Sequence, residues 1–377
     1  MKKLLILILT STAFSCGTSI ITTSNTEDVN QAAFARYQKE TITLDTSLVD
    51  RRLVLAEPVR EETSNYNIIN GVLYLTPQQL IEGGVNIASE WCSRTGGCKD
   101  IMLPFGQHEV KYNFVLHPDV NINSTFTHLK MYPSVADTAA IYFEKGRRAY
   151  ASQITIENLY IELMSPAKGV IQTNGAFKAR IVDCTLQGNK LTDNVLIVGG
   201  GGTPLALDTY VERGEIKGGK ASGIHYERVG GKHRVIGTHI RQSFDGISGF
   251  PNLLIVEACQ IENNDRYNIN LEGGVGVSIT NCTFEKAGIK LTDVPILKFS
   301  FNKMSGGDIE LNGNLYSTIN TSTLFGVNIL ESTRIEVEGN YWQSNTYSEF
   351  IKLNCKDGNT IKSNYNTREG YLKTCNE

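Results

Sequence analysis

Residues 276–291, GVSITNCTFEKAGIKL, hold the pattern that decides the fold of this chain. In ITNCTF (279–284) apolar side chains stand at both ends of a segment centred on Asn and Cys, and AGIKLT (287–292) alternates apolar and polar residues. Such alternation predicts short strands with one buried face. Asn and Gly tolerate positive φ, so their position between the strands predicts tight turns. A single unit of this kind cannot bury its apolar face alone, which implies further copies.

The ITNCTF pattern occurs ten times between residues 156 and 366. Its copies begin at Ile156, Ile181, Val211, Val235, Val256, Ile279, Phe299, Ile319, Val337 and Ile361. The starts lie about 23 residues apart on average, a period typical of solenoids whose coils stack about 4.8 Å apart. We therefore predict an all-β solenoid of about ten coils, in which chain length reflects the number of coils.

The second apolar pattern predicts which side chains face outward. Its inward row is Ile224, Ile247, Ile269, Ile289, Ile309, Val327 and Ile351. Alternation then sends the next residue of each strand outward. The first outward row is His225, Ser248, Asn270, Lys290, Glu310, Asn328 and Lys352. The second is Glu227, Phe250, Glu272, Thr292, Asn312, Leu330 and Asn354.

The composition is that of a folded protein with many turns. Hydrophobic residues make up 41% of 377, which is enough to bury a core. The 35 Gly residues and the frequent Asn residues supply turns. A net charge of −3 argues against nucleic acid as a partner, because binding phosphates needs a basic excess.

The N-terminus predicts export. Two Lys residues precede the apolar run LLILIL and the segment TSTAFSC, the layout of a secretory signal. Cys16 stands where a bacterial lipobox would place the lipidated residue, so residues 1–16 are expected to be a signal peptide and residues 17–70 a tether and N-terminal extension. We expect an outer-membrane or cell-surface lipoprotein attached to the membrane through that lipid alone. A secreted or periplasmic protein is the alternative.

Residues 71–377 are expected to form the solenoid domain. Residues 75–92, LTPQQLIEGGVNIASEWC, predict an amphipathic helix over about 76–92, with Thr76 as N-cap and Pro77 at the first position. Such a helix would cover the first coil, whose strand edges would otherwise be exposed.

The cysteines suggest disulfides rather than a metal site. Cys92 and Cys98 flank a short loop, and Cys355 and Cys375 lie near the C-terminus, so each pair is a disulfide candidate in an oxidising compartment. Cys184, Cys259 and Cys282 share one position of the repeat and are expected to be buried. No Cys and His spacing suggests zinc.

An entry region and two coils resemble a known superfamily. GGCKDIMLPFGQHEV (96–110) with FVLHPDVNIN (114–123), and the coils ASQITIENLYI (151–161) and GVSITNCTFEKAGIKL, are similar to pectate-lyase-like right-handed parallel β-helices, including phage tailspike-type depolymerases. The resemblance implies that fold strongly and a chemistry weakly. Of the polygalacturonase motifs only one Asp, in SFDGIS (243–248), remains. The clustered Asp ligands of calcium-dependent pectate lyases are missing, so we expect no cofactor; calcium is the alternative, although no ligand cluster supports it.

A basic cluster lies between residues 213 and 241. It comprises Arg213, Lys217, Lys220, Arg228, Lys232, Arg234 and Arg241, against Glu215 and Glu227, and it contains His225, His233 and His239. Long inserted loops border it, and loops on a rigid scaffold often carry binding residues. We expect this cluster to attract an anionic polysaccharide, with Lys232 among the binding residues.

Two mechanisms fit these residues. For a lyase acting on a uronate-containing glycan, the base would be His225 or Lys220 and the carboxylate partner Arg228 or Arg241. A glycoside hydrolase or tailspike-like depolymerase would instead use two carboxylates from Glu227, Asp245, Glu272, Asp308 and Glu310. Sugar binding is assigned to Asn270, Lys290, Asp308, Glu310, Asn312 and Lys232. We expect the lyase first. A non-catalytic glycan-binding adhesive lipoprotein, or a structural envelope component, remains an alternative.

Overall fold

The computed structural model describes residues 66–144, 153–173, 178–199 and 208–324, with short stretches between 326 and 366. The predicted signal peptide with Cys16, the tether up to residue 65, Asn354, Cys355 and Cys375 lie outside the described residues. In the described part of the chain no helix is long and apolar enough to cross a membrane.

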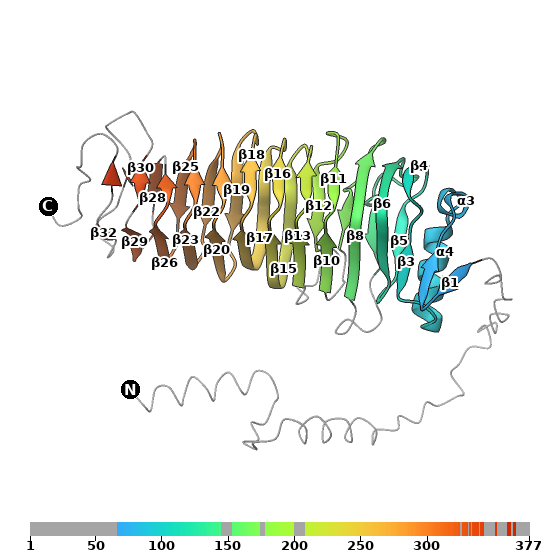
Figure 1. Cartoon of the computed structure of the whole chain (residues 1–377). Helices are drawn as coiled ribbons and strands as arrows, with labels where there is room; N and C mark the ends of the chain where they lie inside the picture. The colour runs from blue at the N-terminus through green and yellow to red at the C-terminus, as the bar shows by residue number, and fades with distance from the viewer. Residues whose placement is uncertain are drawn as a thin grey trace, which may run out of the picture. The chain divides into compact units, whose positions relative to one another are not determined.

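Parallel strands form three stacks, here called A, B and C, along the coils (Figure 1). Stack A contains β2 (Val72–Tyr74), β3 (Asp100–Met102), the first parts of β6 (Asn121–Met131) and β8 (Gln153–Leu163), β10 (Lys178–Val182), β13 (Asp208–Glu212), the last parts of β15 (Ser222–Ile236) and β17 (Asp245–Glu257), β20 (Gly276–Thr280), β23 (Ile296–Ser300), β26 (Tyr316–Asn320), β29 (Ile335–Glu338) and β32 (Thr360–Lys362).

Stack B contains β4 (Gly106–Val110), the last parts of β6 and β8, β11 (Thr185–Gln187), β14 (Glu215–Lys217), β16 (His239–Arg241), β18 (Gln260–Glu262), β21 (Thr283–Phe284), β24 (Lys303–Met304), β27 (Thr323–Leu324), β30 (Tyr341–Trp342) and β33 (Tyr365–Asn366). Stack C contains β5 (Phe114–Leu116), β7 (Ile141–Phe143), β9 (Ile171–Gln172), β12 (Asn194–Val198), the first parts of β15 and β17, β19 (Tyr267–Glu272), β22 (Gly288–Thr292), β25 (Asp308–Asn312), β28 (Gly326–Leu330) and β31 (Ile351–Lys352).

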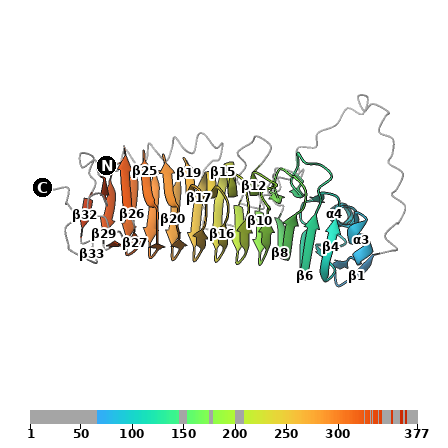
Figure 2. The ribbon, with the colours of Figure 1, turned by 90° about the horizontal axis from the view of Figure 1, so that it is seen from above.

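Each coil passes through A, B and C in turn, and the next coil repeats the order (Figure 2). The predicted parallel β-helix is therefore confirmed. It begins earlier than the repeat suggested, because β3 and β6 already stack on one another before Ile156.

The strand pairings align the predicted inward row of stack C, and burial confirms its direction from Ile224 to Val327. Ile224, Ile247, Ile269, Ile289, Ile309, Val327 and Ile351 pair in that order. The register therefore also aligns the first outward row, from His225 to Lys352, along the coils.

The corner between stacks A and B explains the Asn and small residues of the repeat. Its third residue has a left-handed backbone with φ near 50–60° at Asn158, Asp183, Arg213, Gly237, Ala258, Asn281, Phe301 and Thr321. Its fourth residue points inward, and Cys184, Cys259 and Cys282 are buried there as predicted.

Side chains at this fourth position hold the coils together. The Cys282 N–H donates to Asn302 Oδ1 (2.8 Å), the Asn302 N–H to Ser322 Oγ (3.1 Å), and the Ser322 N–H to Asn340 Oδ1 (3.0 Å). Each side chain thus satisfies a buried backbone donor of the preceding coil, which would otherwise cost free energy.

The N-terminal cover differs from the single predicted helix. The chain forms a hairpin of β1 (Asn67–Ile69) with β2, then α3 (Pro77–Ile81) and α4 (Gly84–Thr95). Thr76 caps α3 with a capping box, as its sequence indicated. Gly83, with φ of 96°, separates the two helices because its left-handed conformation cannot continue a helix.

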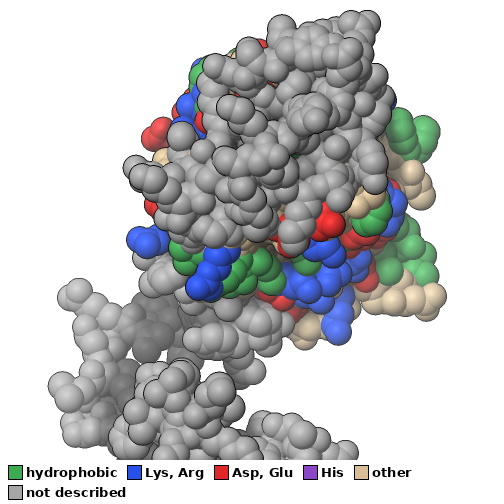
Figure 3. Space-filling model, turned by 90° about the vertical axis from the view of Figure 1, so that its left-hand side faces the viewer, with side chains coloured by type: hydrophobic (Ala, Val, Ile, Leu, Met, Phe, Trp, Pro, Cys, Tyr) green, Lys and Arg blue, Asp and Glu red, His purple; other side chains and the backbone are tan. Residues whose placement is uncertain are grey.

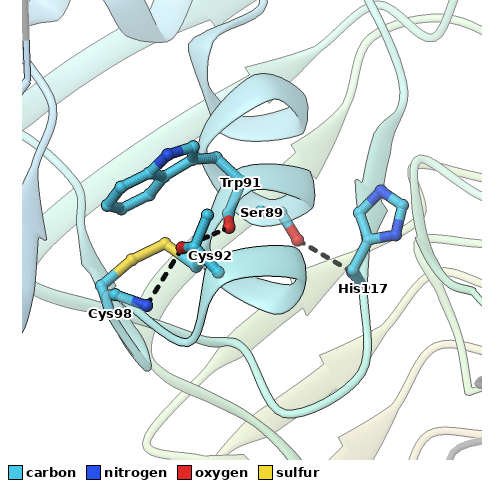
Figure 4. Close-up of a disulfide and its surroundings, with 7 residues drawn as sticks. Ser89, Trp91, Cys92, Cys98 and His117 are labelled. Carbon is cyan, nitrogen blue, oxygen red and sulfur yellow. Dashed lines mark hydrogen bonds between the residues drawn. A yellow bond between two sulfur atoms is a disulfide. The ribbon is translucent and has the colours of Figure 1, made fainter. Parts of the chain in front are cut away.

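The predicted disulfide between Cys92 and Cys98 is present and fastens the end of α4 to the segment before β3 (Figure 4). In the same region Ser89 Oγ accepts a hydrogen bond from the His117 N–H (2.8 Å). The helix is therefore attached both to the loop that follows it and to the coil that it covers.

A buried polar cluster interrupts the apolar core between β13 and β15. His233 is 0% exposed, its ring lies 4.9 Å from that of Tyr226, and it pairs in register with Thr209. Neither Tyr226 Oη nor Thr209 Oγ1 has a hydrogen-bond partner. Burial lowers the pKa of His233 to about 4, against the opposing effects of the Gly230 carbonyl and Asp208.

We predict that Asn302→Ala lowers the free energy of unfolding by about 1–3 kcal/mol, because the Cys282 N–H loses its acceptor. The midpoint of urea unfolding measures this, with Lys303→Ala, an exposed neighbour, as the control. Equal midpoints for the two variants would contradict the role of the ladder.

We predict that His233 makes the protein acid-labile. Its pKa in the folded state lies below the usual 6.5, so its contribution to stability is complete above that pH and declines toward pH 4, as the unfolded chain takes up a proton that the folded chain does not. The loss is on the order of 3 kcal/mol. His233→Leu should reduce the difference in unfolding midpoint between pH 7 and pH 5, and an unchanged difference would contradict the prediction.

Candidate functional site

A groove of about 390 Å³ lies on the outer face of stack C. Its walls come from β12, β15, β17 and β19 and from the turns that precede these strands. His225, Asp245, Asn270 and Glu272, all predicted as site residues, line it together. They come from three successive coils, so the parallel register brings them to one face.

His225 lies at one end of a short chain of hydrogen bonds. Its Nδ1 is 2.9 Å from Ser248 Oγ, which lies 2.6 Å from Ser222 Oγ. Burial lowers the pKa of His225 below its ordinary value of 6.5, and the charge of Glu227 opposes that effect. The imidazole is therefore neutral at pH 7, the form that a general base needs.

The neighbouring Gly249 is required by the packing of two coils. Its φ is 104°, and a Cβ placed there would lie 2.0 Å from the carbonyl oxygen of Tyr226. Glycine at this position lets the strand turn just after Ser248, and it leads to the half-exposed ring of Phe250 at the edge of the groove.

Asp245 and Arg266 form a bidentate ion pair in the groove. The guanidinium Nε donates to Asp245 Oδ1 (2.9 Å) and Nη2 donates to Oδ2, while Asn270 Nδ2 donates to Oδ2 (2.9 Å). The guanidinium also lies over two rings, 4.6 Å from the centre of Phe244 and 5.4 Å from that of Tyr267.

The predicted binding residues continue from the groove along stack C. Lys290 Nζ lies 5.9 Å from the ring centre of Tyr267, whose hydroxyl donates to Glu310 Oε2 (3.3 Å). Asn312 lies in the outward row of Glu272, and Asp308 begins β25. These side chains extend the polar face beyond the groove.

The basic cluster of residues 213–241 is not one surface. Arg213 pairs with Asp183 at the corner of A and B, whereas Lys217 and Arg241 both bind Glu215 in stack B. Lys232 and Arg234 lie in stack A. Lys220 and Arg228 are exposed outside the two ends of the stack C segment of β15.

None of these basic residues lines the groove that contains His225, and Arg241 lies in stack B rather than in stack C. The cause is geometric, because a window of that length runs around the whole circumference of a coil. In Figure 3, which views the coils from their C-terminal side, described Lys and Arg side chains lie beside Asp and Glu side chains. The argument for an anionic polymer from this local charge therefore fails.

Sequence reasoning missed Arg266, Ser222, Phe244 and Tyr267. Arg266 and Phe244 stand in turns, where no periodicity indicates direction, and Tyr267 lies beside an irregularity of register between β19 and β22. Among the described residues no group of three or more His, Cys, Asp or Glu side chains could hold a metal ion.

No protein-family model and no curated protein matches this sequence. Two solved structures are similar in fold. Tailspike protein 3 of bacteriophage CBA120 is 9% identical, with a TM-score of 0.47, over 76% of this chain and 59% of the tailspike chain. The A-module of mannuronan C-5 epimerase AlgE4 from Azotobacter vinelandii is 12% identical, with a TM-score of 0.37, over 75% of this chain and 90% of the module. The chain spans about three fifths of the tailspike chain, and its own strand pairings show a parallel β-helix.

We predict that Glu227→Gln lowers the pKa of His225 further, because the carboxylate that stabilises the imidazolium is removed. NMR titration of the imidazole resonances measures the change. Glu310→Gln, whose residue lies four coils away in the same outward row, should leave the titration unchanged. A pKa that stays constant in Glu227→Gln would show that this charge does not act on His225.

Proposed function

We propose that the chain binds an extended polysaccharide along the outer face of stack C and cleaves it in the groove by β-elimination. The substrate would be a uronate-containing glycan. The observation that carries this proposal is the neutral His225 in one groove with Arg266 and Asn270. Elimination needs a base for the C5 proton and a partner for the uronate carboxylate, and these residue types supply both.

The polar groups of the groove have the capacity for this chemistry. Arg266 has five N–H donors, of which two bind Asp245, and Asn270 gives one of its two amide hydrogens to the same carboxylate. The remaining donors can bind a uronate carboxylate and stabilise the charge that develops when the C5 proton leaves. When Nε2 of His225 takes the C5 proton, the proton on Nδ1 can pass through the hydroxyl of Ser248 to the leaving oxygen, which leaves the imidazole neutral again.

The surroundings of the groove suit a sugar chain. Phe244 is 41% exposed and Phe250 is 40% exposed, and both rings line the groove. They offer apolar surfaces to the faces of sugar rings, while the outward rows of stack C offer amide, hydroxyl and charged groups to the hydroxyls.

The carboxylates favour a hydrolase less. Asp245 accepts three hydrogen bonds and is tied to Arg266. Glu272 lies five residues beyond the register partner of Asp245 on β19, which is about 16 Å along a strand. A hydrolytic pair needs carboxyl groups at most about 9.5 Å apart, so the backbone spacing of these two residues does not favour such a pair.

The signal-like N-terminus and Cys16 support the proposal that the protein is exported and lipidated. At that location a polysaccharide outside the cytoplasm would be within reach of stack C.

The test is cleavage of uronate polymers by the full chain, followed by ultraviolet absorbance of unsaturated ends and by reducing-end release. We expect both signals, and a loss of about 10²–10⁴-fold for His225→Ala. His239→Ala is the matched control, because His239 points outward from stack B. Reducing ends without unsaturated ends would show hydrolysis, and binding without either signal would show a non-catalytic glycan-binding protein. Each of these two outcomes would overturn the proposed elimination.

A further inference from the structure

We propose that Asp245 is a positioning residue that aims Arg266 at an anionic group of the ligand, so that a buried acid in the groove strengthens the binding of an acidic sugar. This inference rests on the proposed function and names the residue pair that would distinguish a uronate from a neutral sugar. It assigns Asp245 a role other than that of a catalytic carboxylate.

Asp245 is built into the wall of the groove. Asp245 is the first residue of β17, where that strand enters stack C, and it is 2% exposed. Both carboxylate oxygens are used, one by Arg266 Nε and the other by Arg266 Nη2 and Asn270 Nδ2. A bidentate pair of this kind fixes the plane of the guanidinium as well as its position.

Two aromatic rings restrict the guanidinium further. Phe244 precedes Asp245 in the chain and Tyr267 follows Arg266, and the guanidinium carbon lies within 4.6 Å and 5.4 Å of their ring centres. The Arg266 side chain remains 45% exposed. Its position is therefore fixed on the inner side by the carboxylate and the rings, and the unused N–H donors are accessible from the groove.

Because the groove carries more negative than positive side chains, binding of an acidic ligand depends on the orientation of Arg266. The lining carboxylates Asp193, Asp245 and Glu272 outnumber the one lining cation, Arg266. The net negative charge of the lining would therefore repel a polyanion at long range. Selectivity for a carboxylate must then come from directed hydrogen bonds at short range. Such bonds require a guanidinium whose orientation is set before the ligand arrives.

The proposal predicts an effect on binding opposite to the one that charge repulsion alone would give. Removing the charge of Asp245 should weaken the binding of an acidic ligand, because Arg266 loses its orientation. Removing the charge of Asp193, which makes no side-chain hydrogen bond to Arg266, should strengthen it, because only repulsion is lost. Asp193→Asn is thus the matched control for Asp245→Asn.

The experiment compares a pair of ligands by calorimetry, an oligouronate and the same oligosaccharide with its carboxyl groups reduced to alcohols. All variants carry His225→Ala, so that the ligands are not cleaved. We expect Asp245→Asn to lower the affinity for the oligouronate about tenfold and to leave that for the neutral ligand unchanged. Arg266→Gln should have the same effect, and adding Asp245→Asn to it should cost nothing more. Arg266→Lys keeps the positive charge but not the planar guanidinium that binds a carboxylate through two hydrogen bonds, so it should not restore the affinity for the oligouronate.

Thermal unfolding of each variant checks that the fold is kept. If Asp245→Asn does not fold, Arg266→Lys tests the role of orientation, because full oligouronate affinity with an ammonium group at this position would overturn the inference. An unchanged or higher oligouronate affinity in Asp245→Asn, or equal losses for both ligands, would overturn the inference. Either result can occur while the wild-type chain still releases unsaturated product. Conversely, the variants could show the expected affinities while the wild-type chain releases no unsaturated product. That result would support the inference and refute the proposed lyase activity.

Discussion

The in-register pairing of each coil with the next is the constraint on which the rest of the structure depends. Parallel hydrogen bonds hold equivalent residues of successive coils side by side, as from Ile224 through Ile247 to Ile269. A shift by one residue would send every aliphatic side chain of a strand outward. The buried row therefore fixes the outward rows, and the outward rows provide the groove.

The corner between stacks A and B shows how the same constraint reaches the turns. There the backbone leaves the strand geometry, and its N–H groups need acceptors from side chains. Cys282, Asn302 and Ser322 lie at equivalent points, so a side chain of one coil serves the backbone of the coil before it. Hydrogen bonds from side chains to the backbone therefore hold neighbouring coils together, in addition to the hydrogen bonds between paired strands.

The fold could be predicted from the sequence because apolar residues recur with the period of the coils. The outward row from His225 to Glu310 followed from the alternation of apolar and polar residues alone. The site could be predicted only in part. His225, Asp245, Asn270 and Glu272 lie on strands, where alternation indicates direction. Arg266 lies in a turn, where no rule of that kind applies. The basic cluster failed for another reason, since residues close in a solenoid sequence are spread around a coil, and neighbours in space are about one period apart.

Because each coil of the described domain contacts chiefly the coils before and after it, distance along the axis separates the parts of the protein. The groove draws all of its lining residues from the coils between β12 and β19. A whole coil gained or lost beyond Asn312 would leave those contacts intact. Evolution can therefore alter the length of the binding face without altering the chemistry of the groove.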